Sequence, residues 1–250
     1  MIRAMIFDLD GTLVQTEKLK AISYAKAVID LCPQTIGEDE VIEAFKEVVG
    51  LSRREVAAAL VDRFDLEAPA QARMQEFGVD SPWQAFVQIR LDHYGDMLAD
   101  PDLLLNNQWP HNRAVLDAAR EEGCRTGLAT MSRCEQAQRV LEILGMKDDF
   151  DFVATRDDVE IGKPDPEIYQ LVSSELDVPA EDCLVLEDSP SGVRAALAAG
   201  MWCIAVTTPF TREQMHALDI LEERWIVDDP EQVTAVVQKM IAEHKGSFVD

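Results

Sequence analysis

Short apolar runs alternate with amphipathic helical patterns from Thr126 onward, and the alternation constrains the fold more than any other feature. The runs cover residues 4–7, 126–129, 152–154, 183–186, 203–206 and, more weakly, 225–227. Between them lie patterns such as "CEQAQRVLEILG" and "SPSGVRAALAAG"; in the second, Ser189 is expected to cap a helix that starts at Pro190 and stops at Gly200. Strands that alternate with helices favour an α/β fold with a parallel sheet core and helices on both faces.

A long segment after the first apolar run carries helical patterns only, from residue 14 to about residue 100. Ser52 and Glu55 form a capping box in "SRRE", and Ser81 is expected to cap a helix with Pro82 in its first turn. We therefore expect an inserted all-helical domain. The expected division is a core domain of residues 1–15 and 99–250 and a helical cap domain of residues 16–98.

The formal net charge of −24, with a pI near 4.4, restricts the possible partners. Such a charge repels nucleic-acid backbones and anionic membrane surfaces, so neither is an expected partner. A small anionic substrate remains compatible, because local cations and a metal ion reverse the field inside a pocket. The five cysteines are scattered without C-x-x-C spacing, and no membrane-length apolar run or signal pattern occurs, so we expect a cytoplasmic protein with free thiols.

Two acids follow the first apolar run in "RAMIFDLDGTLV". Strand alternation sends Asp8 and Asp10 to the same side, and Gly11 permits a sharp turn. Two carboxylates this close repel unless a cation lies between them or one holds a proton, which suits a divalent metal ion plus one acid/base group. A calcium-binding EF-hand loop is excluded because Leu13 and Leu19 stand where it needs glycine and glutamate. For a D-x-D-G motif taken alone, the alternative to a metal site is a simple turn in which the acids accept local hydrogen bonds.

Three further strand ends carry chemistry that complements the two acids. "GLATMS" places Thr130 after one apolar run, "IGKPDPEIY" offers the ammonium of Lys163, and "LVLEDSPSG" places Glu187 and Asp188 after another. Each of these residues also has a purely structural interpretation. Thr130 could cap a helix, Lys163 could be a surface lysine, and Glu187 with Asp188 could be an acid pair at a helix start. Together they indicate a phosphate group and a magnesium ion, because hydroxyl and ammonium groups bind phosphate and hard carboxylate oxygens bind Mg²⁺.

Four motifs, "FDLDGTL", "LATMS", "GKPDPEIY" and "VLEDSPSG", resemble those of the haloacid dehalogenase-like (HAD) superfamily of hydrolases. The helical insertion resembles the cap of its beta-phosphoglucomutase/phosphatase-like subfamily. The resemblance implies a Rossmann-like core and phosphoryl transfer. An acid at position 10 favours phosphoester chemistry, since the dehalogenases need none there and phosphonate-cleaving relatives typically carry alanine.

The resemblance also assigns roles to the motif residues. It makes Asp8 the nucleophile that forms an aspartyl-phosphate and Asp10 the general acid and base. Mg²⁺ would be held by Asp8, the backbone carbonyl of Asp10 and Asp188, with Glu187 as a further ligand or a support. The remaining two motif residues, Thr130 and Lys163, would bind the phosphoryl oxygens.

The cap sequence bears on which phosphoryl reaction is catalysed. In "VGLSRRE", Arg53 falls where mutase relatives hold the second phosphate of a sugar bisphosphate, but Lys20 and Gln15 replace a histidine and an aspartate common in those mutases. We therefore expect a Mg²⁺-dependent phosphatase of a small phosphorylated metabolite, such as a sugar phosphate. The alternatives are a phosphosugar mutase and a non-catalytic binding module. Lys20, Arg53 and Arg133 are the candidate substrate-binding residues, and the expected state is a monomer or weak homodimer.

Overall fold

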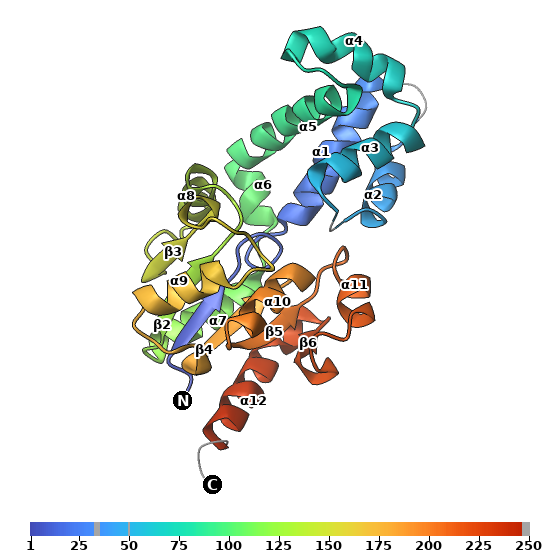
Figure 1. The fold of residues 1–250 in the computed structure, drawn as a ribbon. Helices are drawn as coiled ribbons and strands as arrows, with labels where there is room; N and C mark the ends of the chain where they lie inside the picture. The colour runs from blue at the N-terminus through green and yellow to red at the C-terminus, as the bar shows by residue number, and fades with distance from the viewer. Residues whose placement is uncertain (33–35, 50, 247–250) are drawn as a thin grey trace. The chain divides into compact units, whose positions relative to one another are not determined.

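The chain divides into two units in this computed structural model, which describes residues 1–32, 36–49 and 51–246. Unit 1 comprises Met1–Gln15 and Leu104–Asp250, and unit 2 comprises Thr16–Leu103. Unit 1 therefore consists of two stretches of chain, with unit 2 inserted between them. Figure 1 shows the elements of both units coloured along the chain.

Unit 1 is built on a parallel sheet with the strand order β3-β2-β1-β4-β5-β6 (Figure 1). The strands are β1 (Ala4–Phe7), β2 (Arg125–Ala129), β3 (Phe152–Ala154), β4 (Cys183–Glu187), β5 (Trp202–Val206) and β6 (Ile226–Val227). The last residue of β1, Phe7, pairs with Leu128 of β2 and Leu186 of β4. These three strands therefore end within one residue of the same level, and the segments that follow them leave the same edge of the sheet.

Helices cover both faces of this sheet. On one face, α9 (Glu167–Glu175) and α10 (Pro190–Ala198) pack Tyr169 and Val193 into one buried cluster with Ile6 of β1. The other face carries α7 (Pro110–Glu121) and α12 (Val233–Gly246), which contact each other. The remaining elements are α8 (Cys134–Ile143), α11 (Arg212–Ala217), and the 3-10 turns η1 (Arg156–Asp158), η2 (Ala180–Asp182), η3 (Glu223–Trp225) and η4 (Pro230–Gln232).

The described part of unit 2 is helical. Its helices are α1 (Thr16–Leu31), α2 (Glu38–Lys46), α3 (Arg53–Arg63), α4 (Glu67–Phe77) and α5 (Pro82–Ala99), while the short α6 (Pro101–Asn106) crosses into unit 1. The core of unit 2 holds an aromatic cluster in which Tyr24 stacks on Phe45, with ring centroids 5.3 Å apart, and tilts against Phe86 at 5.8 Å. Apolar side chains of α1, α2 and α5 thus bury one another.

Most of the expected local structure is confirmed. The parallel sheet is present, only helices occur among the described residues of the inserted segment, and Ser52 with Glu55 forms a capping box. Ser189 caps α10, since its hydroxyl accepts a hydrogen bond from the Gly192 N–H at 3.1 Å. Ser81 is the N-cap residue of α5 and Pro82 begins the helix, as expected, but the Ser81 hydroxyl makes no cap hydrogen bond and donates instead to Oε1 of Gln84 at 2.8 Å. None of the described helices combines the length and apolar composition that a membrane span requires.

Candidate active site

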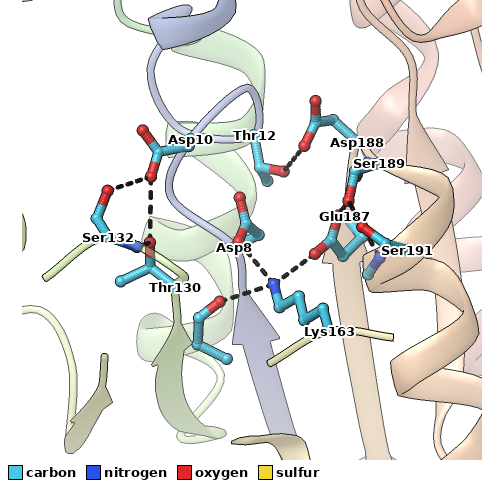
Figure 2. Close-up of polar contacts among 12 residues, drawn as sticks. Asp8, Asp10, Thr12, Thr130, Ser132, Lys163, Glu187, Asp188, Ser189 and Ser191 are labelled. Atoms are coloured by element: carbon cyan, nitrogen blue, oxygen red, sulfur yellow. Dashed lines mark hydrogen bonds and ion pairs between the residues drawn. The ribbon is translucent and has the colours of Figure 1, made fainter. Parts of the chain in front are cut away.

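Polar side chains from β1, β2, β4 and the segment before α9 meet at the carboxyl end of the sheet (Figure 2). Asp8 follows β1, Thr130 follows β2 and Asp188 follows β4, so the shared register of these strands brings them together. Parallel α/β sheets bind ligands at this edge, where loops from adjacent strands converge. The sheet thereby collects residues that lie far apart in the sequence.

Lys163 forms the centre of this group. Its Nζ donates hydrogen bonds to Oδ1 of Asp8 at 2.7 Å, to the carbonyl of Ala129 at 3.0 Å and to Oε1 of Glu187 at 2.5 Å. The side chains of Lys163, Asp8 and Glu187 are 3%, 8% and 1% exposed. Water therefore screens these charges little, and the ion pairs are stronger than surface ones.

The charges of this cluster do not balance. Burial raises the pKa of Asp8 to about 8, the Lys163 ammonium opposes the rise, and the Glu187 and Asp10 carboxylates add to it. Burial alone would lower the pKa of Lys163, but the Asp8 and Glu187 carboxylates raise it above its ordinary value. One ammonium thus faces an excess of carboxylates, and a divalent cation would supply the missing positive charge.

Three buried carboxylates could hold such a cation. Ligand oxygens of Asp8, Glu187 and Asp188 lie within 4.8 Å of one another. These are hard oxygen donors of the kind that Mg²⁺ prefers, so the residues present fit a magnesium ion. Both oxygens of Glu187 are already engaged, however, because Oε2 accepts from the backbone N–H and the hydroxyl of Ser189 at 2.9 and 3.0 Å. Glu187 is therefore better placed to orient Lys163 than to contribute a free ligand oxygen.

The Asp10 carboxylate lies beside Thr130 and Ser132, on the side of the site away from Glu187 and Asp188 (Figure 2). Its Oδ2 accepts hydrogen bonds from Oγ1 of Thr130 at 3.2 Å and from Oγ of Ser132 at 2.6 Å. Two hydroxyl donors fix the orientation of this carboxylate while leaving it partly accessible. Asp8 and Asp10 thus occupy different surroundings, one against an ammonium and one against hydroxyls, which is how a pair of acids takes on separate roles.

A glycine lets the loop after β1 approach Asp188. Gly11 has φ +90°, which favours glycine, and a Cβ at this position would overlap the Asp188 carboxylate. The same loop places Oγ1 of Thr12 3.5 Å from Oδ1 of Asp188. The glycine of "DLDGT" therefore permits a backbone contact with an acid from another strand, as well as a turn.

The three expected substrate-binding residues lie in different parts of the molecule. Arg133 is exposed and is the N-cap residue of α8 in unit 1. Lys20 and Arg53 belong to unit 2, where Nζ of Lys20 pairs with Oε1 of Glu17 at 2.6 Å and Arg53 begins α3. The structure therefore describes Lys20 and Arg53 only in relation to their own unit.

Unit 2 contains a basic residue that sequence reasoning missed. Arg90 on α5 is 5% exposed, and its guanidinium lies over the rings of Tyr24 and Tyr94 at 4.9 and 4.4 Å from their centroids. Its Nε has no hydrogen-bond partner among the described residues. Burial raises the pKa of Tyr24, while the positive charges of Arg90, Arg53 and Lys20 oppose the rise, so all three act on one region of this unit.

Two residues of unit 1 were missed as well. Ser132 stands two positions after Thr130 in "LATMS", and Tyr169 is the final residue of "GKPDPEIY". The hydroxyl of Tyr169, which is fully buried, donates to Oε1 of Glu187 at 3.1 Å. Both residues lie inside motifs used for the prediction, but only the folded chain shows which acid each hydroxyl meets.

Comparisons with known proteins match about four fifths of the chain or more. A family model described as haloacid dehalogenase-like hydrolase matches residues 2–200. A phosphoglycolate phosphatase from Rhodospirillum rubrum is 31% identical over 222 residues, which cover 88% of this chain and 86% of the relative. A phosphorylated carbohydrates phosphatase from Thermotoga maritima is 29% identical over 198 residues, covering 79% and 82%.

A solved structure shows the same fold. The crystal structure of a beta-phosphoglucomutase from Clostridium difficile superposes with a TM-score of 0.64 at 21% identity, covering 97% of this chain and 100% of the other. At this identity the likeness concerns the fold alone.

Proposed function

This chain belongs to the haloacid dehalogenase-like hydrolases, and from that premise we propose that it is a Mg²⁺-dependent phosphatase of a small phosphorylated metabolite, acting through an aspartyl-phosphate. The observation that carries the proposal is the contact of Lys163 with Asp8 beside Asp188. This arrangement joins a nucleophilic carboxylate, a phosphate-binding cation and hard metal ligands at one strand edge. Relatives whose names denote phosphatases of glycolate and carbohydrate phosphates support the same reaction class.

In the first proposed step, a carboxylate oxygen of Asp8 attacks phosphorus while the bond to the leaving oxygen breaks. Asp10 donates its proton to that leaving oxygen, so the product departs as an alcohol. The hydroxyl of Thr130 and the ammonium of Lys163 bind the phosphoryl oxygens and offset their charge. Asp8, the Asp10 carbonyl and Asp188 would hold Mg²⁺, which would supply further positive charge against the repulsion between the two anions.

In the second proposed step, Asp10 takes a proton from water, and the water oxygen attacks phosphorus. The bond from Asp8 to phosphorus breaks, which releases inorganic phosphate and restores the Asp8 carboxylate. The hydroxyl of Ser132, which donates to Asp10, keeps this carboxylate oriented through both proton transfers. Glu187 keeps Lys163 in place through the whole cycle.

Unit 2 is proposed to act as the cap that selects the substrate. Its positive charges at Lys20, Arg53 and Arg90 favour substrates with an anionic or strongly polar group remote from the reacting phosphate. Arg133 of unit 1 is proposed as a further substrate contact. Small carbohydrate phosphates and phosphorylated acids both have the required chemistry.

The positive charges of Lys20, Arg53 and Arg90 also favour one alternative function, a phosphosugar mutase that holds a second phosphate. The pairing of Lys20 with Glu17 argues against it, because the histidine found there in related mutases is replaced by a lysine already engaged in an ion pair. A mutase would convert a sugar 1-phosphate to the 6-phosphate after addition of a bisphosphate primer, with little free phosphate. A phosphatase would release phosphate without a primer.

The test is a panel of phosphorylated metabolites assayed with Mg²⁺, in which released phosphate and isomerised sugar are measured in parallel. Asp8→Asn is expected to lower turnover by at least about 10³-fold, because the nucleophile is lost. Asp148→Asn, at an exposed acid outside the cluster, is the matched control and retains full turnover. Circular dichroism checks that both variants are folded, and undiminished turnover by Asp8→Asn would reject the mechanism.

A further inference from the structure

Asn112 is a polar residue on the face of α7 that otherwise presents apolar side chains to the core. The other buried residues of this face are Val115, Leu116 and Ala119, at helical spacing from Asn112. Only 3% of Asn112 is exposed. Asparagine is also a weaker helix former than leucine, so neither the helix nor the core explains its presence.

In the side-chain amide of Asn112, the nitrogen makes a hydrogen bond but the oxygen makes none among the described residues. Its Nδ2 donates a 2.6 Å hydrogen bond to the carbonyl of Thr12, which lies 100 positions away in the sequence. Its Oδ1 is buried and has no hydrogen-bond partner among the described residues. An unpartnered buried acceptor costs about 1–3 kcal/mol, which a leucine of similar size would avoid. The one donated hydrogen bond is therefore maintained at the expense of stability.

That hydrogen bond holds the loop that carries Asp10. Thr12 is fully buried, and its hydroxyl faces Asp188 while its carbonyl faces Asn112. The next two peptide groups of the loop, at Leu13 and Val14, donate to the carbonyl of Leu9 at 2.9 and 3.2 Å. Rotation of the Thr12 peptide would turn this tight loop as a whole, and Asp10 with it.

We propose that Asn112 is a positioning residue for the reaction: its amide holds the Thr12 carbonyl and so fixes the orientation of loop 8–14, which carries Asp10. The rate effect rests on the proposed function, whereas the effect on the loop does not. Asn112 acts from the helix behind the loop and touches no reacting atom. Its contribution is to keep the acid/base group within reach of the leaving oxygen, where small displacements have large effects on rate.

The test replaces Asn112 by leucine, which removes both the donor and the unpartnered acceptor. Asn112→Leu is expected to melt at the same or a higher temperature, to lose at least about tenfold in kcat and to change KM by less than about threefold. Amide hydrogen exchange at Leu13 and Val14 is expected to quicken.

The matched control is Thr126→Val, which removes another buried hydrogen bond from a side chain to a backbone carbonyl. Oγ1 of Thr126 donates to the carbonyl of Asp149 at 2.8 Å, at the end of β2 away from the site. This variant is expected to melt at a lower temperature, with kcat and exchange in loop 8–14 unchanged.

A second variant, Asn112→Met, also lacks a side-chain donor and must reproduce both the kcat loss and the faster loop exchange. The proposal is overturned if either variant keeps the wild-type kcat, or if kcat falls while exchange at Leu13 and Val14 does not change. It is also overturned if Asn112→Leu fails to fold. Turnover by Asp8→Asn would instead refute the proposed function, and the exchange measurement would still decide the claim about the loop.

Discussion

Glu187 accepts hydrogen bonds from four donors at the candidate site. Oε1 accepts from Lys163 and Tyr169, and Oε2 accepts from the backbone and hydroxyl of Ser189. The carboxylate also lies against the first turn of α10, where a Cβ at Gly192 would overlap it. The glycine in "EDSPSG" is thus a requirement of close packing against an acid.

Gly192→Ala is therefore expected to be damaging. The added methyl group has to displace the Glu187 carboxylate or the start of α10, which costs about 1–3 kcal/mol of the free energy of unfolding. Displacement of Glu187 also releases Lys163, so phosphatase turnover should fall in the folded variant. Urea denaturation and kcat measurements check the two effects.

The matched control is Gly95→Ala in α5, where nothing lies within 4 Å of an added Cβ. This change is expected to raise stability by up to about 1 kcal/mol, because alanine is the better helix former. Wild-type stability for Gly192→Ala would contradict the close contact between this helix turn and Glu187.

At the scale of elements, His216 joins α11 to the segments on either side of β6. Its Nδ1 lies 3.0 Å from Oε2 of Glu223, and its Nε2 lies 3.1 Å from Oδ2 of Asp228. Both ring nitrogens can donate at once only when the imidazole is protonated. Asp228 is in turn bound by Arg212 and by the hydroxyl of Thr207.

These contacts make the stability of this region dependent on pH. Hydrogen bonds to Glu223 and then Asp228 raise the pKa of His216 above its ordinary value of 6.5. A raised pKa in the folded state gives stability that is complete below the unfolded pKa and is lost as pH rises through the folded pKa. His216→Gln should therefore lower the melting temperature more at about pH 5.5 than at about pH 9. An equal change at both pH values would contradict the assignment.

The sheet and its helices follow from local patterns. The capping box at Ser52 and the cap at Ser189 involve residues three positions apart, so the sequence displays both partners. Ser81 is likewise the N-cap residue of α5 as predicted, but its hydroxyl donates to Gln84, also three positions away, and makes no hydrogen bond to the backbone. A local pattern thus predicts where a helix starts. It does not predict whether the hydroxyl of the N-cap residue bonds to the backbone or to a nearby side chain.

For the whole molecule, the net charge of −24 sets a general repulsion. Compact folding brings these charges closer together than they are in the unfolded chain, so self-repulsion opposes folding. Surface ion pairs such as Arg63 with Glu47 and Arg224 with Glu243 offset little of it, because exposed pairs contribute about 0–1 kcal/mol each.

Neutral salt should therefore stabilise this protein. Raising NaCl from about 0.02 M to about 0.5 M shortens the Debye length to a few ångströms and screens repulsion between distant surface charges. We expect the melting temperature to rise across this range at constant pH. A fall would mean that attractive ion pairs outweigh the net repulsion.

The sequence by itself determined the alternation of strands and helices, the helical insertion and the motif acids, because periodicity and adjacent residue types carry this information within a few positions. From Asp8, Asp10, Lys163 and Asp188 it predicted a meeting of charges at the carboxyl end of a sheet, and the structure brings them there.

Only the tertiary structure decided which partner each side chain takes. Three contacts join segments that belong to different elements of the fold. They are the hydrogen bonds of Ser132 with Asp10, of Tyr169 with Glu187 and of Asn112 with Thr12. Nothing near Asn112 in the sequence points to a carbonyl 100 positions away, because the pairing arises only when α7 packs beside the loop after β1. Local patterns specify the elements, but the burial of polar groups in a shared interior selects their partners.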